Sequence, residues 1–149
     1  MKQITFMNCP MNPVSMVETV DDIKTKIGQG QFVQHVVVNV AKLVNVQNDK
    51  VLFDSVASCD IINIDGQGVV LGAKALGHDV PERVAGIDLF YELLAMSEQQ
   101  GYPVFLLGAE QGVLDKTVEA VGKKYPKLTI AGSHHGYFDD EQVVVGKVK

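Results

Sequence analysis

The segment DIINIDGQGVV, residues 60–70, places a carboxylate between an apolar run and two glycines. Residues 61–65 have the composition of a buried strand, and Asp65 stands at its carboxyl end. A carboxylate that apolar neighbours partly shield can become basic enough to accept a proton from a hydroxyl group. Alternatively, Asp65 caps the next helix by accepting hydrogen bonds from the amides near Gln67 and Gly68. The residues alone favour the two interpretations equally, and one does not exclude the other.

Other polar residues and glycines also stand at the ends of apolar runs. They are Asn39, Asp65 with Gly66, Gly108, and residues 133–137. The carboxyl ends of parallel strands share one edge of a sheet, and ligands bind outside that edge. We therefore expect these segments to converge on one site.

The segment LLGAEQGV, residues 106–113, reads as a strand, a glycine turn and the start of a helix. Backbone amides in such a turn can approach a diphosphate at the positive end of a helix. The segment fits neither the G-x-G-x-x-G nor the G-x-x-x-x-G-K pattern, and many α/β proteins have glycine in such turns for steric reasons alone. By itself it is a weak indication of nucleotide binding.

The segment GSHHGYF, residues 132–138, gathers three polar rings. Adjacent histidines rarely point the same way, and no third ligand is evident, so a metal site is not predicted. His134, His135 and Tyr137 are expected to line a pocket or to hold a loop by hydrogen bonds.

Arg83, in PERVAGIDL, is a single cation in a loop that contains glycine. It can meet a diphosphate, or form a surface salt bridge with a residue such as Glu82 or Asp88. A serine or cysteine nucleophile is not supported, because no G-x-S-x-G segment is present and neither cysteine adjoins a histidine.

The elements that position these residues alternate between strand and helix. The predicted strands are residues 3–7, 32–40, 61–65, 103–108 and 128–132. The predicted helices are residues 15–28, two pieces within 41–58, residues 67–76, 86–101 and 112–126, and a further one beginning at 139–140. This order predicts βαβ units in an α/β, Rossmann-like fold of three layers, with a mainly parallel sheet covered by helices on both faces.

The first helix has the clearest local signals. Ser15 and Glu18 form a capping-box pattern. The apolar residues at helical spacing, which predict the buried face, are Val17, Val20, Ile23 and Ile27.

The composition fits one soluble domain covering residues 1–149, with 46% hydrophobic residues and a formal net charge of −5. This charge argues against nucleic-acid binding by phosphate neutralisation. Two cysteines without neighbouring metal ligands indicate free thiols in a reducing cytoplasm. No signal-peptide core or membrane span is evident, so we expect any membrane contact to be peripheral.

Several segments in order resemble the WecG/TagA/CpsF family of glycosyltransferases over residues 7–140. They are VVVNVAKLV, residues 58–70, PERVAGIDLFYELL, VFLLGAEQGV and SHHGYF. The resemblance implies transfer of an N-acetylmannosamine-type sugar from a UDP-sugar to an N-acetylglucosaminyl-diphospho-polyprenol acceptor, in teichoic acid, cell-wall or capsule synthesis. It implies a hexosyltransferase that needs no obligatory metal or other cofactor, and self-association into a homo-oligomer.

The resemblance also implies a role for each site residue. Asp65 is the general base of a single displacement that inverts the anomeric carbon. The residues implied to bind substrate are Asn39, Gly66, Gln67 and Arg83. Those implied to bind the nucleotide are Gly108, Ala109, Gly112, His135, Gly136 and Tyr137.

Two departures from the family pattern stand out. Val37 replaces a threonine two residues before the strand-end asparagine, which removes one polar contact. The sequence stops at Lys149, before the G-x-P-K-Q-E loop and the basic, apolar C-terminal segment of the family. The chain is therefore expected to be a family core without its closing part, and the resemblance implies that peripheral membrane contact is made only through that missing part.

Two other hypotheses stay open. A dinucleotide-binding domain of the NAD type is suggested by fold analogy alone, since G-x-G-x-x-G and the acidic residue about twenty positions later are both lacking. A non-catalytic remnant of the transferase fold is the other.

Overall fold

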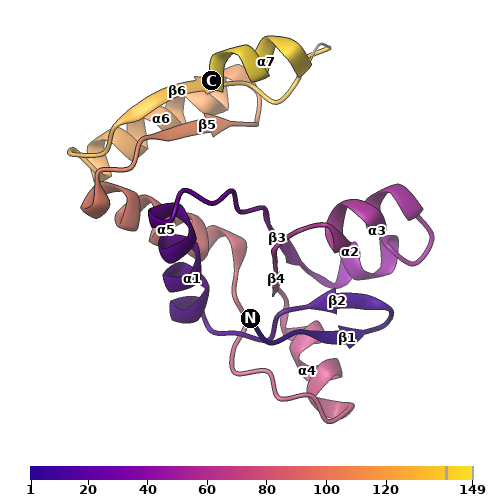
Figure 1. The fold of residues 1–149 in the computed structure, drawn as a ribbon. Helices are drawn as coiled ribbons and strands as arrows, with labels where there is room; N and C mark the ends of the chain where they lie inside the picture. The colour runs from indigo at the N-terminus through magenta and orange to yellow at the C-terminus, as the bar shows by residue number, and fades with distance from the viewer. Residues whose placement is uncertain (140, 149) are drawn as a thin grey trace. The chain divides into compact units, whose positions relative to one another are not determined.

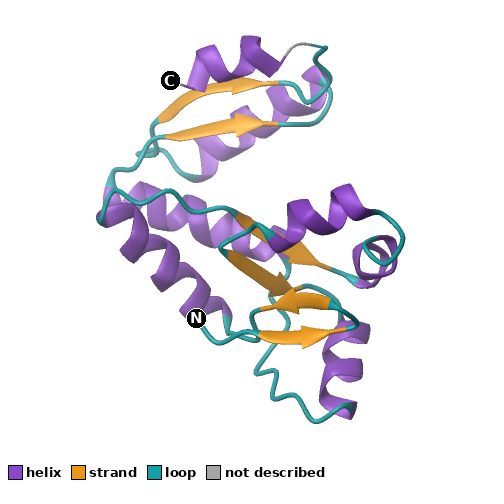
Figure 2. Cartoon of the chain, turned by 45° about the vertical axis from the view of Figure 1, so that its right-hand side comes forward, coloured by secondary structure: helices purple, strands orange, loops and turns teal. Residues whose placement is uncertain are grey.

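The computed structural model describes residues 1–139 and 141–148 of the 149-residue chain. Its contacts divide the chain into two compact units, Met1–Phe90 and Tyr91–Lys149. Helices and strands alternate through both units (Figure 2). The fold class is α/β and Rossmann-like, with parallel strand pairs flanked by helices, as the sequence predicts. In the described ranges, every helix is too short or too polar to cross a bilayer.

The first unit holds a hairpin, a parallel strand pair and the helices around them. Its elements are β1 (Ile4–Phe6), β2 (Cys9–Met11), α1 (Met16–Gly28), β3 (His35–Val38), α2 (Val40–Asn45), α3 (Lys50–Ala57), β4 (Ile61–Ile64) and α4 (Gln67–Ala75), and α5 (Gly86–Gln100) begins in it. β3 and β4 are parallel, with Val38 opposite Ile64. α1 lies on one side of this pair, and α2 and α3 lie on the other (Figure 1).

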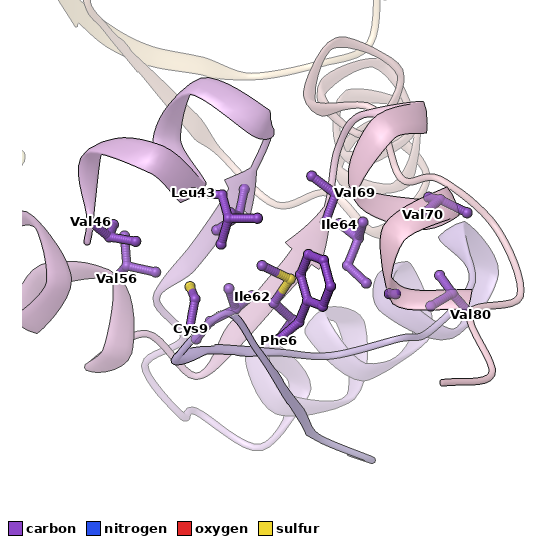
Figure 3. Close-up of a cluster of buried hydrophobic side chains, with 13 residues drawn as sticks. Phe6, Cys9, Leu43, Val46, Val56, Ile62, Ile64, Val69, Val70 and Val80 are labelled. Carbon is purple, nitrogen blue, oxygen red and sulfur yellow. The ribbon is translucent and has the colours of Figure 1, made fainter. Parts of the chain in front are cut away.

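The main apolar cluster lies on one face of the β3–β4 pair. Ile62 and Ile64 point to this face, where they meet Phe6 from the hairpin (Figure 3). The other buried members from the two strands, the hairpin and the surrounding segments are Cys9, Met11, Val38, Leu43, Val46, Val56, Val69, Val70, Ala73 and Val80. Because side chains alternate along a strand, the residues between these isoleucines point to the opposite face.

That opposite face carries a buried polar network. Asn63 is fully buried, and its Oδ1 lies 2.7 Å from His35 Nε2. Its Nδ2 donates to Thr19 Oγ1 of α1 at 2.9 Å, and Thr19 donates onward to the Ser15 carbonyl at 2.9 Å. Since Asn63 Oδ1 can only accept, His35 must donate from Nε2. The network therefore joins α1 to both strands with a fixed direction of donation.

The hairpin was not predicted in full. The sequence indicated a strand at residues 3–7, but β2 also forms and pairs with β1 in antiparallel register. Met7 and Asn8 turn the chain with φ of 48° and 58°, the backbone of a type I′ hairpin turn without glycine. Pro10 concealed β2, because proline weakens a strand prediction, although it is tolerated in an edge strand such as this one.

The apolar stripe predicted for α1 is partly wrong. Ser15 and Glu18 do form the capping box, and Ile23 is buried. Val17 and Ile27, however, are 68% and 39% exposed, and Thr19 is buried instead. The buried face of α1 differs from the predicted stripe because Thr19 is hydrogen-bonded to Asn63. The spacing of apolar residues does not reveal this partner.

The second unit repeats the strand–helix–strand plan. It contains the rest of α5, then β5 (Val104–Leu107), α6 (Gln111–Lys124), β6 (Ile130–His134) and α7 (Glu141–Val148). β5 and β6 are parallel, with Leu107 opposite His134. The last helix was expected to begin at residues 139–140 and to continue to the end of the chain. Asp140 and Lys149 lie outside the described residues.

Two strand boundaries differ from the predicted ones. The predicted strand 32–40 is confined to β3, and Phe32 is 85% exposed. The predicted strand 128–132 begins and ends two residues later, as β6, because the Leu128 amide bonds the Tyr125 carbonyl in a turn. His134 therefore belongs to the strand and not to the loop after it.

Replacing Asn63 with leucine should lower the free energy of unfolding by about 1–3 kcal/mol, because buried hydrogen-bonding groups lose their partner while the side-chain volume changes little. Chemical denaturation measures this loss. Asn48→Leu, at an exposed position, is the matched control and should have little effect. Equal stability of the two variants would contradict the structural role of the network.

Acidification should weaken the fold through His35. Burial lowers the pKa of His35 from its ordinary value of 6.5, Lys42 lowers it further, and the hydrogen bond to Asn63 opposes both. The folded state thus prefers neutral His35, so its contribution is present above about pH 6.5 and is lost as the pH falls through the lower, folded-state pKa. Denaturation at several pH values across this range gives the free energy of unfolding of the wild type and of His35→Gln. The difference between the two free energies should shrink on acidification. A difference that is constant with pH would contradict this assignment.

Candidate functional site

Asp65 extends β4 by one residue. Its amide donates to the Val38 carbonyl at 2.9 Å, which continues the parallel pairing to the carboxyl edge. Its side chain is 24% exposed. Oδ2 accepts a hydrogen bond from the Gly86 amide at 3.3 Å, at the first residue of α5. The carboxylate is therefore held at the positive end of a helix, with part of its surface open.

Capping of the next helix by Asp65 is not observed. Gly66 is the N-cap of α4, and no side chain caps that helix. Gly66 has φ of +137°, and a Cβ on it would lie 3.7 Å from the Cα of Asn39. Asp65 contacts the start of α5 instead of α4, because the turn at Gly66 separates its side chain from the α4 amides.

Arg83 lies beside Asp65. Its Nη1 is 3.8 Å from Asp65 Oδ1, and its side chain is 47% exposed. The predicted alternatives, pairing with Glu82 or Asp88, are not observed; Glu82 instead accepts a hydrogen bond from the Met16 amide. The loop before α5 is fixed to β4 where the Val84 amide donates to the Ile64 carbonyl at 2.9 Å.

Asn39 follows β3 directly, as predicted, and caps α2. Its Oδ1 accepts from the Lys42 amide at 2.9 Å, and its side chain is exposed. The Nδ2 group is therefore the part of Asn39 that can donate to a ligand. Gln67, also predicted, is the exposed first residue of α4.

Sequence reasoning missed two residues of this half of the site. Gly86 lies close to the opposite strand, because a Cβ there would come within 3.2 Å of a Val37 methyl, tighter than an ordinary contact, and within 3.9 Å of Asp65 Oδ2. A glycine at the start of an apolar helix could have indicated this close approach. Lys42 donates from Nζ to the Val37 carbonyl at 2.9 Å, and no pattern in the sequence signals it.

The second unit holds the predicted glycine turn between β5 and α6. Gly108 has φ of +135°, and Ala109 follows with φ of 58°. The Gly108 amide donates to the His134 carbonyl at 3.0 Å, and the Gly136 amide donates to the Ala109 carbonyl at 2.9 Å. The turn after β5 and the loop after β6 are therefore joined by their backbones, as predicted for segments at one sheet edge. Gly112 lies in the first turn of α6, and a Cβ on it would meet open space.

The loop after β6 orients His135 and Tyr137. The Tyr137 amide donates to His135 Nδ1 at 3.2 Å, so neutral His135 carries its proton on Nε2. The centroid of the His134 ring lies 4.5 Å from that of His135, and His134 Nδ1 bonds the His135 carbonyl at 2.8 Å. A shallow pocket of about 310 Å³ is lined by Glu110, Gln111, His135 and Tyr137. A pocket was predicted at His134, His135 and Tyr137; the latter two line this one and His134 does not, while Glu110 was not recognised.

The structure thus brings the predicted residues together as two sets. Asn39, Asp65, Gly66, Gln67 and Arg83 belong to the first unit, and the residues in 108–112 and 135–137 belong to the second. Within each set the contacts above join separate strand ends. Convergence of the two sets on one site stays a prediction.

Replacing Gly136 with alanine should lower the free energy of unfolding by about 1–3 kcal/mol, the range for overpacking. The new Cβ would lie 3.1 Å from the Cα of Gly108, a backbone atom that cannot move aside alone. Chemical denaturation of the purified variant measures the effect.

Gly112→Ala is the matched control, because its Cβ enters open space within a helix and is expected to be neutral or to stabilise by up to about 1 kcal/mol. Unchanged stability of Gly136→Ala would show that the two loops are not pressed together.

Comparison with known proteins identifies the family. Residues 4–149 match the model of the glycosyl transferase WecG/TagA/CpsF family. Three relatives carry the name N-acetylglucosaminyldiphosphoundecaprenol N-acetyl-beta-D-mannosaminyltransferase. The one from Bacillus spizizenii is 39% identical over 62% of this chain and 36% of its own length, and the one from Bacillus subtilis is 33% identical over 67% and 39%.

The third relative, from Staphylococcus aureus, is 27% identical over 99% of this chain and 59% of its own length. The chain therefore matches less than two thirds of the length of each of these relatives. The family match, in contrast, covers nearly all of its residues. The chain belongs to the WecG/TagA/CpsF family of glycosyl transferases.

Proposed function

We propose that the chain is the core of an inverting hexosyltransferase. It moves an N-acetylmannosamine-type sugar from a UDP-sugar to an N-acetylglucosaminyl-diphospho-polyprenol acceptor, in synthesis of a teichoic acid or a related cell-wall polymer. The names of the relatives support this substrate pair. The observation that carries the proposal is the partly open Asp65 carboxylate at the carboxyl end of β4, beside the Arg83 guanidinium.

Asp65 is the general base of this reaction. The acceptor hydroxyl oxygen attacks the anomeric carbon, the bond from that carbon to UDP breaks, and the hydroxyl proton passes to Asp65. Because the nucleophile enters opposite the leaving group, an α-linked donor gives a β-linked product. The word beta in the names of the relatives agrees with this outcome.

The two carboxylate oxygens of Asp65 have different surroundings. Oδ2 is bound by the Gly86 amide, which fixes the orientation of the group. Oδ1 faces Arg83 at 3.8 Å, a separation longer than a direct hydrogen bond. Oδ1 therefore has more lone-pair capacity left than Oδ2 for the acceptor hydroxyl.

Charge develops on the diphosphate as UDP leaves, and the enzyme must stabilise it. Arg83 supplies a half-exposed cation for this purpose in the first unit. Asn39 donates from Nδ2, with Gly66 and Gln67 beside it, to the sugar or the diphosphate. In the second unit, the nucleotide contacts Gly108, Ala109, Gly112 and residues 135–137. None of these roles requires a metal ion.

The same proposal covers the setting of the reaction. A polyprenyl-linked acceptor resides in a membrane, so the enzyme works at the cytoplasmic face of one, as a peripheral protein and a homo-oligomer. Residues 1–149 act as one catalytic core domain, with the two compact units as its parts.

Asp65→Asn should reduce the rate of sugar transfer by about 10²–10⁴-fold, the range for loss of a general base. Affinity for UDP should remain, because Asp65 acts on the acceptor. Transfer from UDP-N-acetylmannosamine to a lipid-linked N-acetylglucosamine acceptor measures the rate, and calorimetry measures UDP binding.

Asp21→Asn, at an exposed carboxylate of α1, is the matched control and should leave transfer unchanged. An Asp65→Asn variant that retains the full rate would contradict the role as base. The variant could instead lose folding stability while the molecules that remain folded transfer sugar normally. That result would show that Asp65 serves to hold the start of α5.

A further inference from the structure

The loop that carries Arg83 is fixed on both sides of this residue. On the side toward α5, the Val84 amide donates to the Ile64 carbonyl of β4 at 2.9 Å, and the Val84 side chain is fully buried. On the other side, the Glu82 carboxylate accepts a hydrogen bond from the Met16 amide, at the first residue of α1. Arg83 therefore stands between an anchor on β4 and an anchor on α1.

The amino end of α1 suits the Glu82 carboxylate. The capping box engages the amides of Ser15 and Glu18, and it leaves the Met16 amide for a partner from elsewhere in the chain. Glu82, 66 residues later, supplies that partner. The partial positive charge of a helix start stabilises a carboxylate there. Two segments that are distant in sequence are therefore joined by a charge-assisted hydrogen bond.

The contact of Arg83 with Asp65 is too weak to place the guanidinium. Nη1 lies 3.8 Å from Asp65 Oδ1, longer than a direct hydrogen bond, and the Arg83 side chain is 47% exposed. An ion pair at such an open position contributes little toward holding a long side chain in one geometry. The place of the guanidinium therefore depends on the backbone of residue 83, which the two neighbouring anchors fix.

We propose that Glu82 is a positioning residue for sugar transfer: through the amino end of α1, it holds the backbone that presents Arg83 to Asp65 and to the departing diphosphate. This inference rests on the proposed function, in which Arg83 stabilises the charge that develops on the diphosphate. It goes beyond that function by giving Glu82 a role and by making α1 part of the support of the site.

Glu82→Ala should lower kcat for sugar transfer by about 10–100-fold, with little change in KM. Arg83 acts on charge that develops as UDP leaves, and displacement of such a group by about 1 Å can cost about a hundredfold in rate. Glu82→Gln keeps an oxygen that accepts from the Met16 amide, so it should retain most of the wild-type rate. Steady-state kinetics of the full chain measure both variants.

A double substitution separates positioning from a general effect on stability. If Glu82 acts through Arg83, Glu82→Ala should cost nothing further in an Arg83→Ala background. Glu98→Ala is the matched control, because the Glu98 carboxylate accepts from the distant Lys127 amide at 2.8 Å in the second unit. It removes a hydrogen bond of the same kind from another loop and should leave kcat unchanged.

Hydrogen exchange tests the anchor without any substrate. Glu82→Ala should speed exchange of the Met16 and Val84 amides, and Glu98→Ala should not. Unchanged exchange at both amides in Glu82→Ala overturns the inference. An equal loss of rate from Glu82→Ala in the wild-type and Arg83→Ala backgrounds also overturns it, because the effect would then not pass through Arg83.

The remaining outcomes separate this inference from the proposed function. An active wild type whose rate Glu82→Ala retains in full overturns the inference and leaves the proposed function standing. A wild type that neither transfers sugar nor binds UDP overturns both, because Glu82 then has no reaction to serve.

Discussion

The backbone of Gly86 approaches the Asp65 carboxylate closely, and this contact constrains the rest of the first unit. Glycine eases this approach, because a Cβ would come within 3.2 Å of a Val37 methyl, which would have to shift. The approach also requires the loop before α5 to be fixed to β4, which the hydrogen bond from Val84 to Ile64 provides. β4 itself is buried along its whole length. The backbone that carries the carboxylate is therefore fixed, and the Gly86 amide orients the group before any substrate arrives.

The same local arrangement occurs in each unit. A strand ends, a glycine with φ near +135° turns the chain, and a helix follows, at Gly66 in one unit and Gly108 in the other. In the first unit the turn lies against Asn39, and in the second it lies against Gly136. Each unit therefore joins two strand ends through a glycine contact. The polar groups differ: a carboxylate and a guanidinium in the first, and a carboxylate and an oriented imidazole in the second.

Residues with a local signal could be predicted from the sequence. Apolar runs predicted the parallel strands, the Ser15–Glu18 pair predicted the start of α1, and Asp65 was proposed as a site residue because a carboxylate interrupts an apolar strand. The residues that were missed depend on contacts between distant segments. Thr19 is buried because its hydroxyl accepts a hydrogen bond from Asn63 Nδ2, and Gly86 matters because Val37 lies opposite. Hydrophobic periodicity contains no information about such pairs, so the buried side of α1 and the partner of Arg83 could only be read from the fold.

The central claim is that this core recognises a uridine nucleotide through a transferase site, and not a dinucleotide through a fold that merely looks similar. Calorimetric titration of the purified 149-residue chain with UDP and, separately, with NAD tests it most directly. The account predicts saturable binding of UDP and no response to NAD. Binding of NAD without binding of UDP would contradict it, and would assign the two glycine turns to a dinucleotide.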